Sequence, residues 1–388
     1  MPTTGDAPAA QYPRRLIALS PARRRFGSAA DMIGTMLRVG DPLGDAAVTD
    51  LAGHRVPPAA VTALLEGRSA SVAVPDSLTA LVAELERLPS WVRPERLQRG
   101  SAAYLGIGTV WMQLLLGPGS LINTYRSPGL ARVLTSTGRL VTRAPRRIQE
   151  TGAWLGSAVQ PRALRVGAPG YVATAQVRLF HARMRAELLR RGWDVEQWGV
   201  PINQADLART LLDFTYVPIQ AMGRLGVGLR PHERDDVHHL FRYIAHLLGI
   251  DPALQVDDHA GATNLAALLE MVTPPPDEGS RALVDALLEA YAQLLTPVIH
   301  TPEGMTRELV LALAQIFHGA PVCRRLGMAA PAWWAVAAVR ALGIANSLTR
   351  LAHRAVPAAG RRQVRRAHSA IRQQASMLTG PTAYQQLP

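Results

Sequence analysis

The chain has 388 residues, of which 48% are hydrophobic, and a formal net charge of +13. This composition is typical of a folded globular protein and excludes an intrinsically disordered one. One cysteine and no lysine are present, which excludes an intrachain disulfide, a cysteine-held metal cluster, a P-loop and Schiff-base chemistry on a lysine.

The chain begins with a basic segment. Residues 1–26 contain five arginines and one acidic residue, and no apolar run there is long enough for a secretory leader. Because few acids compensate this charge, we predict that 1–26 is a loosely ordered extension that the fold does not need. The missing leader and the single cysteine predict a soluble, cytoplasmic protein.

Apolar residues recur at helical spacing along the body of the chain, and strand signals are scarce. The most apolar stretch, 102–117, is interrupted by Gln113 and stopped by Gly117-Pro118-Gly119, so we interpret it as a buried helix and expect no membrane span. In chain order, the predicted helices cover 28–38, 58–66, 76–88, 102–116, 128–140, 145–159, 172–191, a segment that begins after Asn203 as its N-cap, 233–249, 280–296, 304–318 and 331–353.

The segment 145–159 carries two different faces. Arg147, Glu150, Thr151 and Trp154 form one stripe at helical spacing. A second stripe on the same helix is apolar and predicts the side that faces the core. By itself, the first stripe is typical of a solvated face.

The segment 172–191 carries a histidine within an apolar stripe. His181 follows Val177 by one turn, and Arg178 and Arg185 project within about 60° of it. One interpretation is a core histidine with polar neighbours. The other is a flat apolar ligand with two carboxylates, such as haem b, whose iron would take the imidazole while the arginines pair its propionates. The residues alone leave these two interpretations level.

A later helix, 233–249, holds a group of histidines. His238 and His239 point about 100° apart, and His246 lies about 10 Å along the axis from His239, too far to share one metal. We interpret all of them as polar positions that flank a core helix. No His-Glu-x-x-His or Glu-x-x-His motif occurs in the chain.

The chain ends in a second basic segment. Residues 339–388 contain eight arginines and no acidic residue, and we predict a loosely ordered tail over 356–388. Without its two ends the chain is nearly neutral, whereas a nucleic-acid-binding domain more often carries its charge on one folded face. We therefore predict no nucleic-acid partner, although the basic ends could contact a surface peripherally.

Several segments together resemble one family. The run Val177–Arg185 is similar to the Arg-x-x-His-Ala-x-x-Arg segment of the rubber-oxygenase and MpaB-type family. The resemblance covers about residues 35–330, and it implies one all-α domain over 27–355 whose helices pack around a haem in a globin-like manner. The other matching segments follow in the family's order: Gly40–Ala46, Thr137–Leu140, Arg147–Thr151, Trp198–Leu207 and Phe241–Gly249.

The resemblance also implies a site. Members of the family bind haem b through the histidine that matches His181, and a distal segment supplies an arginine, a lysine and a threonine. Arg147 and Thr151 match the arginine and the threonine, but Glu150 stands at the lysine position. Since that lysine can occupy the sixth site of the iron, we predict an acid–base role for Glu150 and catalytic roles for all three residues.

Members of this family cleave isoprenoid carbon–carbon double bonds with dioxygen. The resemblance therefore implies a haem b-dependent oxygenase that uses dioxygen on an apolar, unsaturated small molecule of secondary metabolism, because a cytoplasmic enzyme would not reach extracellular rubber. Two alternatives stay open: a haem-dependent oxidase or dehydrogenase that inserts no oxygen, and a non-catalytic haem-binding protein. A polar distal stripe favours the enzymes over the haem carrier.

Overall fold

The computed structural model of the protein describes residues 12–136 and 140–355, and five isolated positions beyond them, 362, 365, 366, 369 and 382. The predicted tail, 356–388, lies outside the described residues except at those positions. The elements are α1 (Leu19–Phe26), α2 (Ala29–Met36), α3 (Pro42–His54), α4 (Pro58–Leu65), α5 (Asp76–Glu86), α6 (Pro94–Leu105), α7 (Thr109–Leu115), the π-helix η2 (Leu116–Leu121), α8 (Ile122–Tyr125), α9 (Pro128–Thr135), α10 (Leu140–Ala158), α11 (Pro169–Arg190), α12 (Val195–Trp198), α13 (Gln204–Phe214), α14 (Tyr216–Arg224), α15 (Pro231–Leu247), the 3₁₀ helix η3 (Pro252–Leu254), α16 (His259–Val272), α17 (Glu278–Ile299), α18 (Glu303–His318), α19 (Ala320–Arg325) and α20 (Trp333–Ala355).

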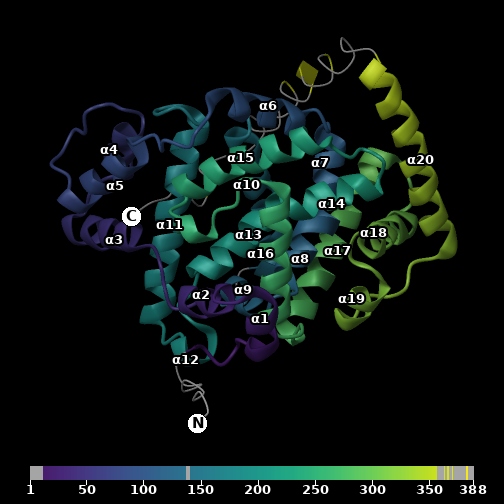
Figure 1. The fold of residues 1–388 in the computed structure, drawn as a ribbon, viewed down its shortest axis with the longest axis horizontal. Coiled ribbons are helices and arrows are strands. Elements are labelled where there is room, and N and C mark those ends of the chain that lie inside the picture. Colours follow the sequence, from purple (N-terminus) through teal and green to yellow (C-terminus); the bar gives the residue numbers. More distant parts are fainter. Residues whose placement is uncertain are drawn as a thin grey trace, which may run out of the picture.

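The described residues form helices and no strands, which confirms the all-α prediction. Figure 1 shows α3, α4 and α5 along one side of the molecule and α18, α19 and α20 along the other, with α13 and α15 between them. Most predicted helices are present within a few residues, and Asn203 is the N-cap of α13, because its side chain accepts a hydrogen bond from the backbone N–H of Asp206 at 2.9 Å.

Two clusters of buried hydrophobic side chains hold the helices together. The larger one includes the closely packed pair α6 and α15, where the rings of Tyr104 and Phe241 lie 5.2 Å apart. The smaller one joins α17 and α18 to α8, α9 and α19, and includes Tyr291 and Cys323. Cys323 is the only cysteine of the chain, and burial raises the pKa of its thiol to about 11.

The structure differs from the prediction at 102–116. The predicted single helix is divided: α6 ends at Leu105, and α7 begins after Gly108, whose φ is +91°. The glycine–proline run that was expected to stop the helix instead continues as the π-helix η2. The ring of Tyr291 lies where a Cβ on Gly117 would project, so only glycine allows this close packing.

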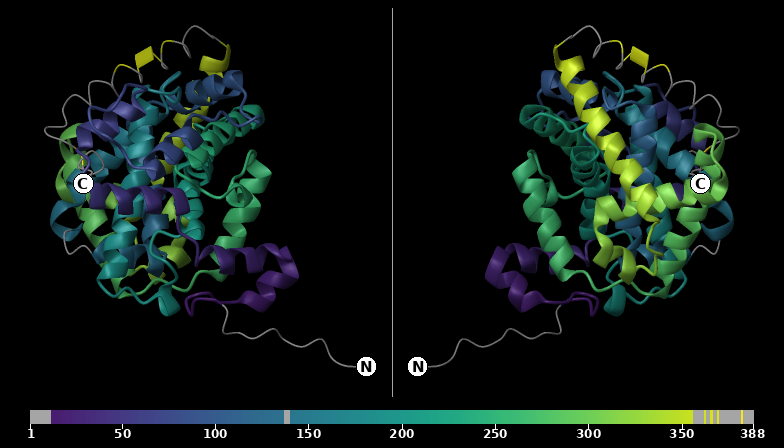
Figure 2. Two further views of the ribbon diagram at one scale, coloured as in Figure 1. Left: turned by 90° about the vertical axis from the view of Figure 1, so that its left-hand side faces the viewer. Right: turned by 90° about the vertical axis from the view of Figure 1, so that its right-hand side faces the viewer.

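The N-terminal segment also differs from the prediction. Residues 12–26, expected to be part of a loose extension, pack against the body of the protein. Nη2 of Arg15 lies 2.7 Å from Oδ2 of Asp206, and the two side chains are only 6% and 9% exposed. The backbone N–H of Ile17 donates to the carbonyl of Val272 at the end of α16, and Figure 2 shows α1 and α2 at one corner of the molecule beside α16.

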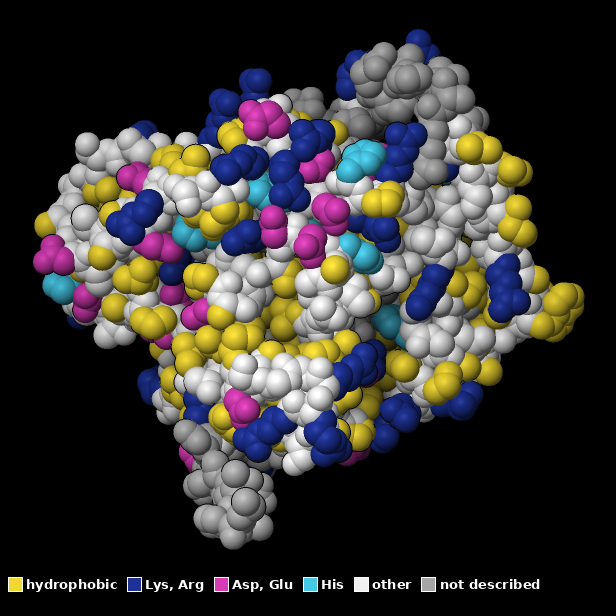
Figure 3. Space-filling view, viewed as in Figure 1, with side chains coloured by type: hydrophobic (Ala, Val, Ile, Leu, Met, Phe, Trp, Pro, Cys, Tyr) yellow, Lys and Arg dark blue, Asp and Glu magenta, His cyan; other side chains and the backbone are white. Residues whose placement is uncertain are grey.

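The long helix α20 lies on the outside of the molecule, where the right-hand view of Figure 2 shows it crossing the surface. Its inner face is anchored by the buried side chains of Ala335 and Val339, and Nδ2 of Asn346 donates to the carbonyl of Leu225 at 2.9 Å. Figure 3 shows hydrophobic and basic side chains along this edge. Within the described ranges, no helix is both long enough and apolar enough to cross a bilayer.

Candidate functional site

The helix α11 presents the predicted histidine on its less buried face. His181, Val177 and Met184 are half-buried, whereas the face that carries Arg178 and Arg185 is packed into the protein. The predicted apolar stripe is therefore present but is only partly covered by the described residues. The ring of Phe180 lies 6.4 Å from that of His181 and shares this partly covered side.

Arg178 is fixed by two carboxylates. Its Nε and Nη2 atoms donate to the two oxygens of Asp41 at 2.6 and 2.9 Å, and Nη1 donates to Oε2 of Glu84 at 2.8 Å. Burial lowers the pKa of Arg178, but the hydrogen bonds and charges of Asp41 and Glu84 outweigh burial and raise it. The guanidinium is therefore held charged inside the protein.

Arg185, about two turns further along α11, is fixed in the same way. Its Nη1 atom pairs with Asp45, and Nε and Nη2 donate to the carbonyl oxygens of Pro201 and Ile202 at 3.2 and 2.8 Å. Burial raises the pKa of the Asp45 carboxyl, while the charge of Arg185 acts in the opposite direction. This arginine joins α11 to the start of α3 and to the loop before α13.

These contacts correct the predicted role of the two arginines. The sequence placed Arg178 and Arg185 against the propionates of a haem. Both side chains are at most 3% exposed, and their N–H groups point at acceptors of the chain itself. We therefore assign both arginines the role of positioning α11.

The same contacts explain why several motif segments meet at α11. A Cβ on Gly40 would lie 3.0 Å from Cδ of Arg185, and a Cβ on Gly249, which has a φ of +72°, would collide with the guanidinium of Arg178. Nε2 of Gln204 links the two glycines by donating to the carbonyls of Gly40 and Gly249 at 2.7 and 2.9 Å. The segments that converge here are Gly40–Ala46, Trp198–Leu207 and Phe241–Gly249.

The helix α10 runs beside α11 in a register that two contacts define. A Cβ on Gly170 would lie 3.0 Å from Cα of Ala158, and one turn further along α11, Oγ1 of Thr174 accepts a hydrogen bond from Nε1 of Trp154 at 3.2 Å. Since the residue number falls by four on α10 as it rises by four on α11, the helices are antiparallel. The predicted 147–150 segment lies one to two turns before Trp154 on α10.

Glu150 is buried on this segment of α10. Its side chain is 10% exposed, and Oε1 accepts a hydrogen bond from Nε of Arg146, one turn earlier, at 3.0 Å. Thr151 is half-buried beside it. The side chain of Arg147 lies outside what the structure describes, so its predicted role stays a prediction.

Trp154, the last residue of the predicted polar stripe, belongs to the hydrophobic core. It is 5% exposed and meets the ring of Phe214 edge-on, with the ring centroids 5.7 Å apart. The Glu150 face of α10 is therefore turned inward, which excludes the interpretation of the stripe as a solvated surface for Glu150 and Trp154.

Two histidines of α15, His238 and His239, are buried, which corrects the prediction that they flank the core, whereas His246 is half-buried as a flanking position would be. His238 and His239 are each 1% exposed. Nδ1 of His239 donates to Oδ1 of Asp257 at 2.6 Å, and its Nε2 accepts from the backbone N–H of Arg93 at 3.1 Å. Nε2 of His238 lies 3.2 Å from Nδ1 of His259. Both ring nitrogens of His239 are therefore satisfied, whereas Nδ1 of His238 is buried without a hydrogen-bond partner in the described part of the chain. Within the described residues no cluster of three or more potential ligands could hold a bare metal ion.

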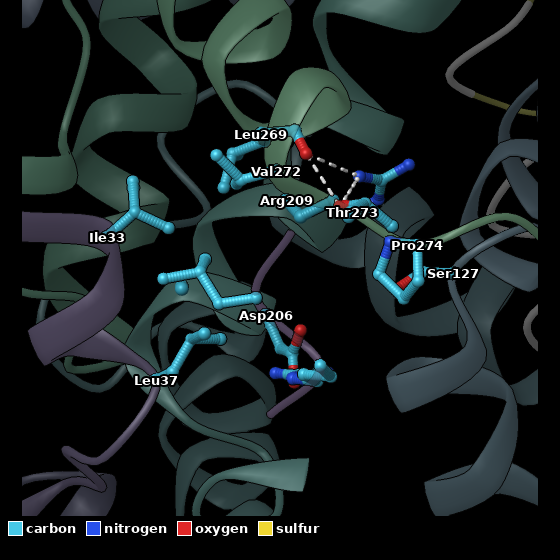
Figure 4. Close-up of a pocket in the computed structure, with 12 residues that line it drawn as sticks. Ile33, Leu37, Ser127, Asp206, Arg209, Leu269, Val272, Thr273 and Pro274 are labelled. Atoms are coloured by element: carbon cyan, nitrogen blue, oxygen red, sulfur yellow. Dashed lines mark hydrogen bonds and ion pairs between the residues drawn. The ribbon is translucent and has the colours of Figure 1, made fainter. Parts of the chain in front are cut away.

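A small pocket lies away from the α10–α11 pair. It is lined by residues of the N-terminal segment, α2, α13 and α16, including Arg15, Asp206 and Arg209. Figure 4 shows Arg209 reaching the carbonyl of Leu269 and the hydroxyl of Thr273, at 3.4 and 2.9 Å. Because its polar groups already bind one another, this pocket is a packing feature of the N-terminal segment.

The fold is that of a known class of helical protein. It is similar to a solved structure of latex clearing protein LCP in the closed state, with a TM-score of 0.67 and 18% sequence identity, covering 89% of this chain and 92% of that one. No curated protein matches the chain. Residues 95–355 match the family described as ER-bound oxygenase mpaB/B′/Rubber oxygenase, catalytic domain, so the chain belongs to that family and is an oxygenase. This confirms the resemblance stated from the sequence motifs.

Proposed function

We propose that the protein is a haem b-dependent oxygenase in which His181 binds the iron and an apolar, unsaturated small molecule is the substrate. The observation that carries the proposal is the position of His181. It lies on a half-buried apolar stripe of α11, next to the helix α10 that buries Glu150, in a chain of the oxygenase family.

The residues present fit a haem better than a bare metal ion. A bare ion needs three or four protein ligands, and no such cluster occurs in the part of the chain that the structure describes. A porphyrin supplies four equatorial ligands, so one imidazole suffices. The partly covered stripe of Val177, His181 and Met184 offers the apolar surface that a flat macrocycle would cover.

Bound haem would supply the activation of dioxygen, and the chain would supply position and environment. Arg178 and Arg185 hold α11, and with it the imidazole of His181, in a fixed orientation through contacts to α3 and α5. Trp154 and Phe214 pack edge-on in the core, and Trp154 also donates a hydrogen bond to Thr174, which joins α10 to α11.

Glu150 gives this chain a different distal group from the family's lysine. The chain has no lysine, so it lacks the amine that can occupy the sixth site in relatives. The carboxylate of Glu150, held by Arg146, would instead accept or return a proton at Oε1 or Oε2, and the hydroxyl of Thr151 would donate a hydrogen bond beside it.

The proposal is tested by purifying the full chain from haem-replete cells. We expect a Soret band with near-stoichiometric haem b, most of which is lost in His181→Ala. His181→Ala must remain folded by circular dichroism for this loss to count. A colourless, folded wild-type protein would overturn the haem assignment. Product analysis with labelled dioxygen then distinguishes oxygen insertion from oxidation without insertion.

A further inference from the structure

The outer face of α20 exposes several large hydrophobic side chains, with the exposed Arg340 among them. Trp333, Ile344, Leu348 and Leu351 are 83%, 67%, 66% and 65% exposed. At 100° per residue these four side chains project within about 60° of one another, directly away from the buried positions Ala335 and Val339. We call these four residues the α20 outer stripe; it extends for about 27 Å along the helix axis.

This stripe is unlike the rest of the described surface. The other exposed large hydrophobic side chains, apart from Leu342 on the same helix, are scattered singly over several elements. Isolated exposed apolar residues are ordinary, whereas a contiguous apolar face marks an interaction surface. Figure 3 shows hydrophobic side chains gathered along the edge of the molecule where α20 runs.

The sequence that carries the stripe is basic, and of its arginines Arg350 is paired with Glu233. Residues 309–388, which include α20, contain ten arginines and no acidic residue. Arg340 is exposed on α20 itself, and Arg324 and Arg325 are exposed on the preceding helix α19. An exposed apolar face bordered by arginines is the pattern of a helix that lies in the interface of an anionic bilayer.

We propose that α20 is an interfacial helix that docks the protein on an anionic lipid surface, with its outer stripe buried among the acyl chains and its arginines at the headgroups. The helix does not cross the bilayer, since no helix of the described ranges has the required length and hydropathy. The docking is independent of the haem and of the chemistry proposed above.

Charge complementarity selects the lipid surface over a second copy of the chain. Two α20 helices packed stripe against stripe would bring their exposed Arg340 side chains into one interface, and α20 itself contains no acidic residue to neutralise them. An anionic bilayer provides both the apolar layer and the opposite charge.

The test is co-sedimentation of the full chain with vesicles of phosphatidylcholine alone and of phosphatidylcholine mixed with phosphatidylglycerol. We expect binding to the mixed vesicles only. The double substitution Ile344→Ser and Leu348→Ser should weaken that binding by about tenfold or more, because it removes two apolar side chains from the interface. Leu88→Ser, which changes an equally exposed leucine elsewhere, is the matched control and should bind like wild type.

A second measurement tests whether α20 itself enters the lipid. Trp333 fluorescence, taken as the difference between wild type and Trp333→Phe, should shift to shorter wavelength when mixed vesicles are added. Equal binding of the double variant and wild type would overturn the proposal, since the arginines alone would then account for attachment. A vesicle-free wild-type dimer that the double variant converts to monomer would overturn it in favour of a second copy.

Discussion

The buried carboxylate of Asp41 serves two helices at once. It accepts two hydrogen bonds from Arg178 of α11, and it also caps α3 by accepting from the backbone N–H of Gly44 at 3.2 Å. Asp41 and Arg178 are 5% and 3% exposed. One side chain therefore fixes both the start of α3 and the orientation of the helix that carries His181.

We predict that Arg178→Ala lowers the free energy of unfolding by about 3–5 kcal/mol, because it leaves Asp41 charged and buried without its partner. Urea denaturation measures the effect. Arg190→Ala, at an exposed ion pair on the same helix, is the control and should change stability by less than about 1 kcal/mol. If the double variant Arg178→Ala and Asp41→Ala costs the full sum of its single variants, the two residues are not coupled.

A second prediction concerns the N-terminal segment. Arg15→Ala should destabilise the protein by about 3 kcal/mol or more, since the ion pair with Asp206 is almost completely buried. Arg14→Ala removes a neighbouring arginine whose pair with Asp194 is 3.4 Å long and exposed, and should change stability by less than about 1 kcal/mol. Thermal unfolding compares the two. Equal, small effects would show that the segment is as loose as its composition suggests.

A third prediction concerns Glu150 on α10. Glu150→Gln should alter turnover or the position of the Soret band while leaving haem bound, because the proposed ligand on α11 is untouched. Arg146→Ala and Arg147→Ala should have the same kind of effect, whereas Gln149→Ala, on the exposed face of α10, should not. A Glu150→Gln protein that matches wild type in spectrum and rate would remove the distal assignment and leave His181 unaffected.

A fourth prediction concerns acid stability. Burial lowers the pKa of His238 and of His318 to about 4, from the ordinary histidine value of about 6.5. Between pH 4 and pH 6.5 the two imidazoles bind protons in the unfolded chain but not in the folded one. The contribution of these histidines to the free energy of unfolding is therefore complete above pH 6.5 and is lost as the pH falls towards 4. Each histidine contributes on the order of 3 kcal/mol to this loss.

The variant His318→Asn tests this prediction. In the native protein Nε2 of His318 lies 2.8 Å from the carbonyl oxygen of Pro118, and the asparagine amide keeps a hydrogen-bond donor near that oxygen. We expect the variant to lose less stability than wild type between pH 7 and pH 5 in urea denaturation. The comparison of variants is needed because burial raises the pKa of Asp213 to about 6, which acts with the opposite sign. Identical pH dependence of the two proteins would contradict the prediction.

The helices could be predicted because their signals are local. The N-cap of α13 and the helical spacing along α11 and α15 are contained in short stretches of sequence, and the structure has these elements. The break between α6 and α7 was missed although Gly106 and Gly108 are a local signal for it. The close packing of Gly117 of η2 against the ring of Tyr291 was missed because its partner lies far along the chain. Long-range packing of this kind has no local signature.

The site was predicted only in part, because some of its contacts are also long-range. The sequence identified α10 and α11 and their residues, but it could not find the partners of Arg178 and Arg185, since Asp41 and Asp45 lie about 140 positions away. The spacing of Asp41 and Asp45 within a glycine-containing motif was the available signal. The haem, its ligand His181 and a cytoplasmic location stay predictions.

The lone cysteine provides a way to observe transient opening of the native protein. Cys323 on α19 is 4% exposed, and the high pKa of its thiol leaves very little thiolate at neutral pH. A thiol reagent can therefore reach it only when α19 separates from α17 and α18, so the labelling rate reports how often that happens. Because every labelled molecule gains one adduct at one known position, mass spectrometry can follow local opening of this side of the fold independently of events at α10 and α11.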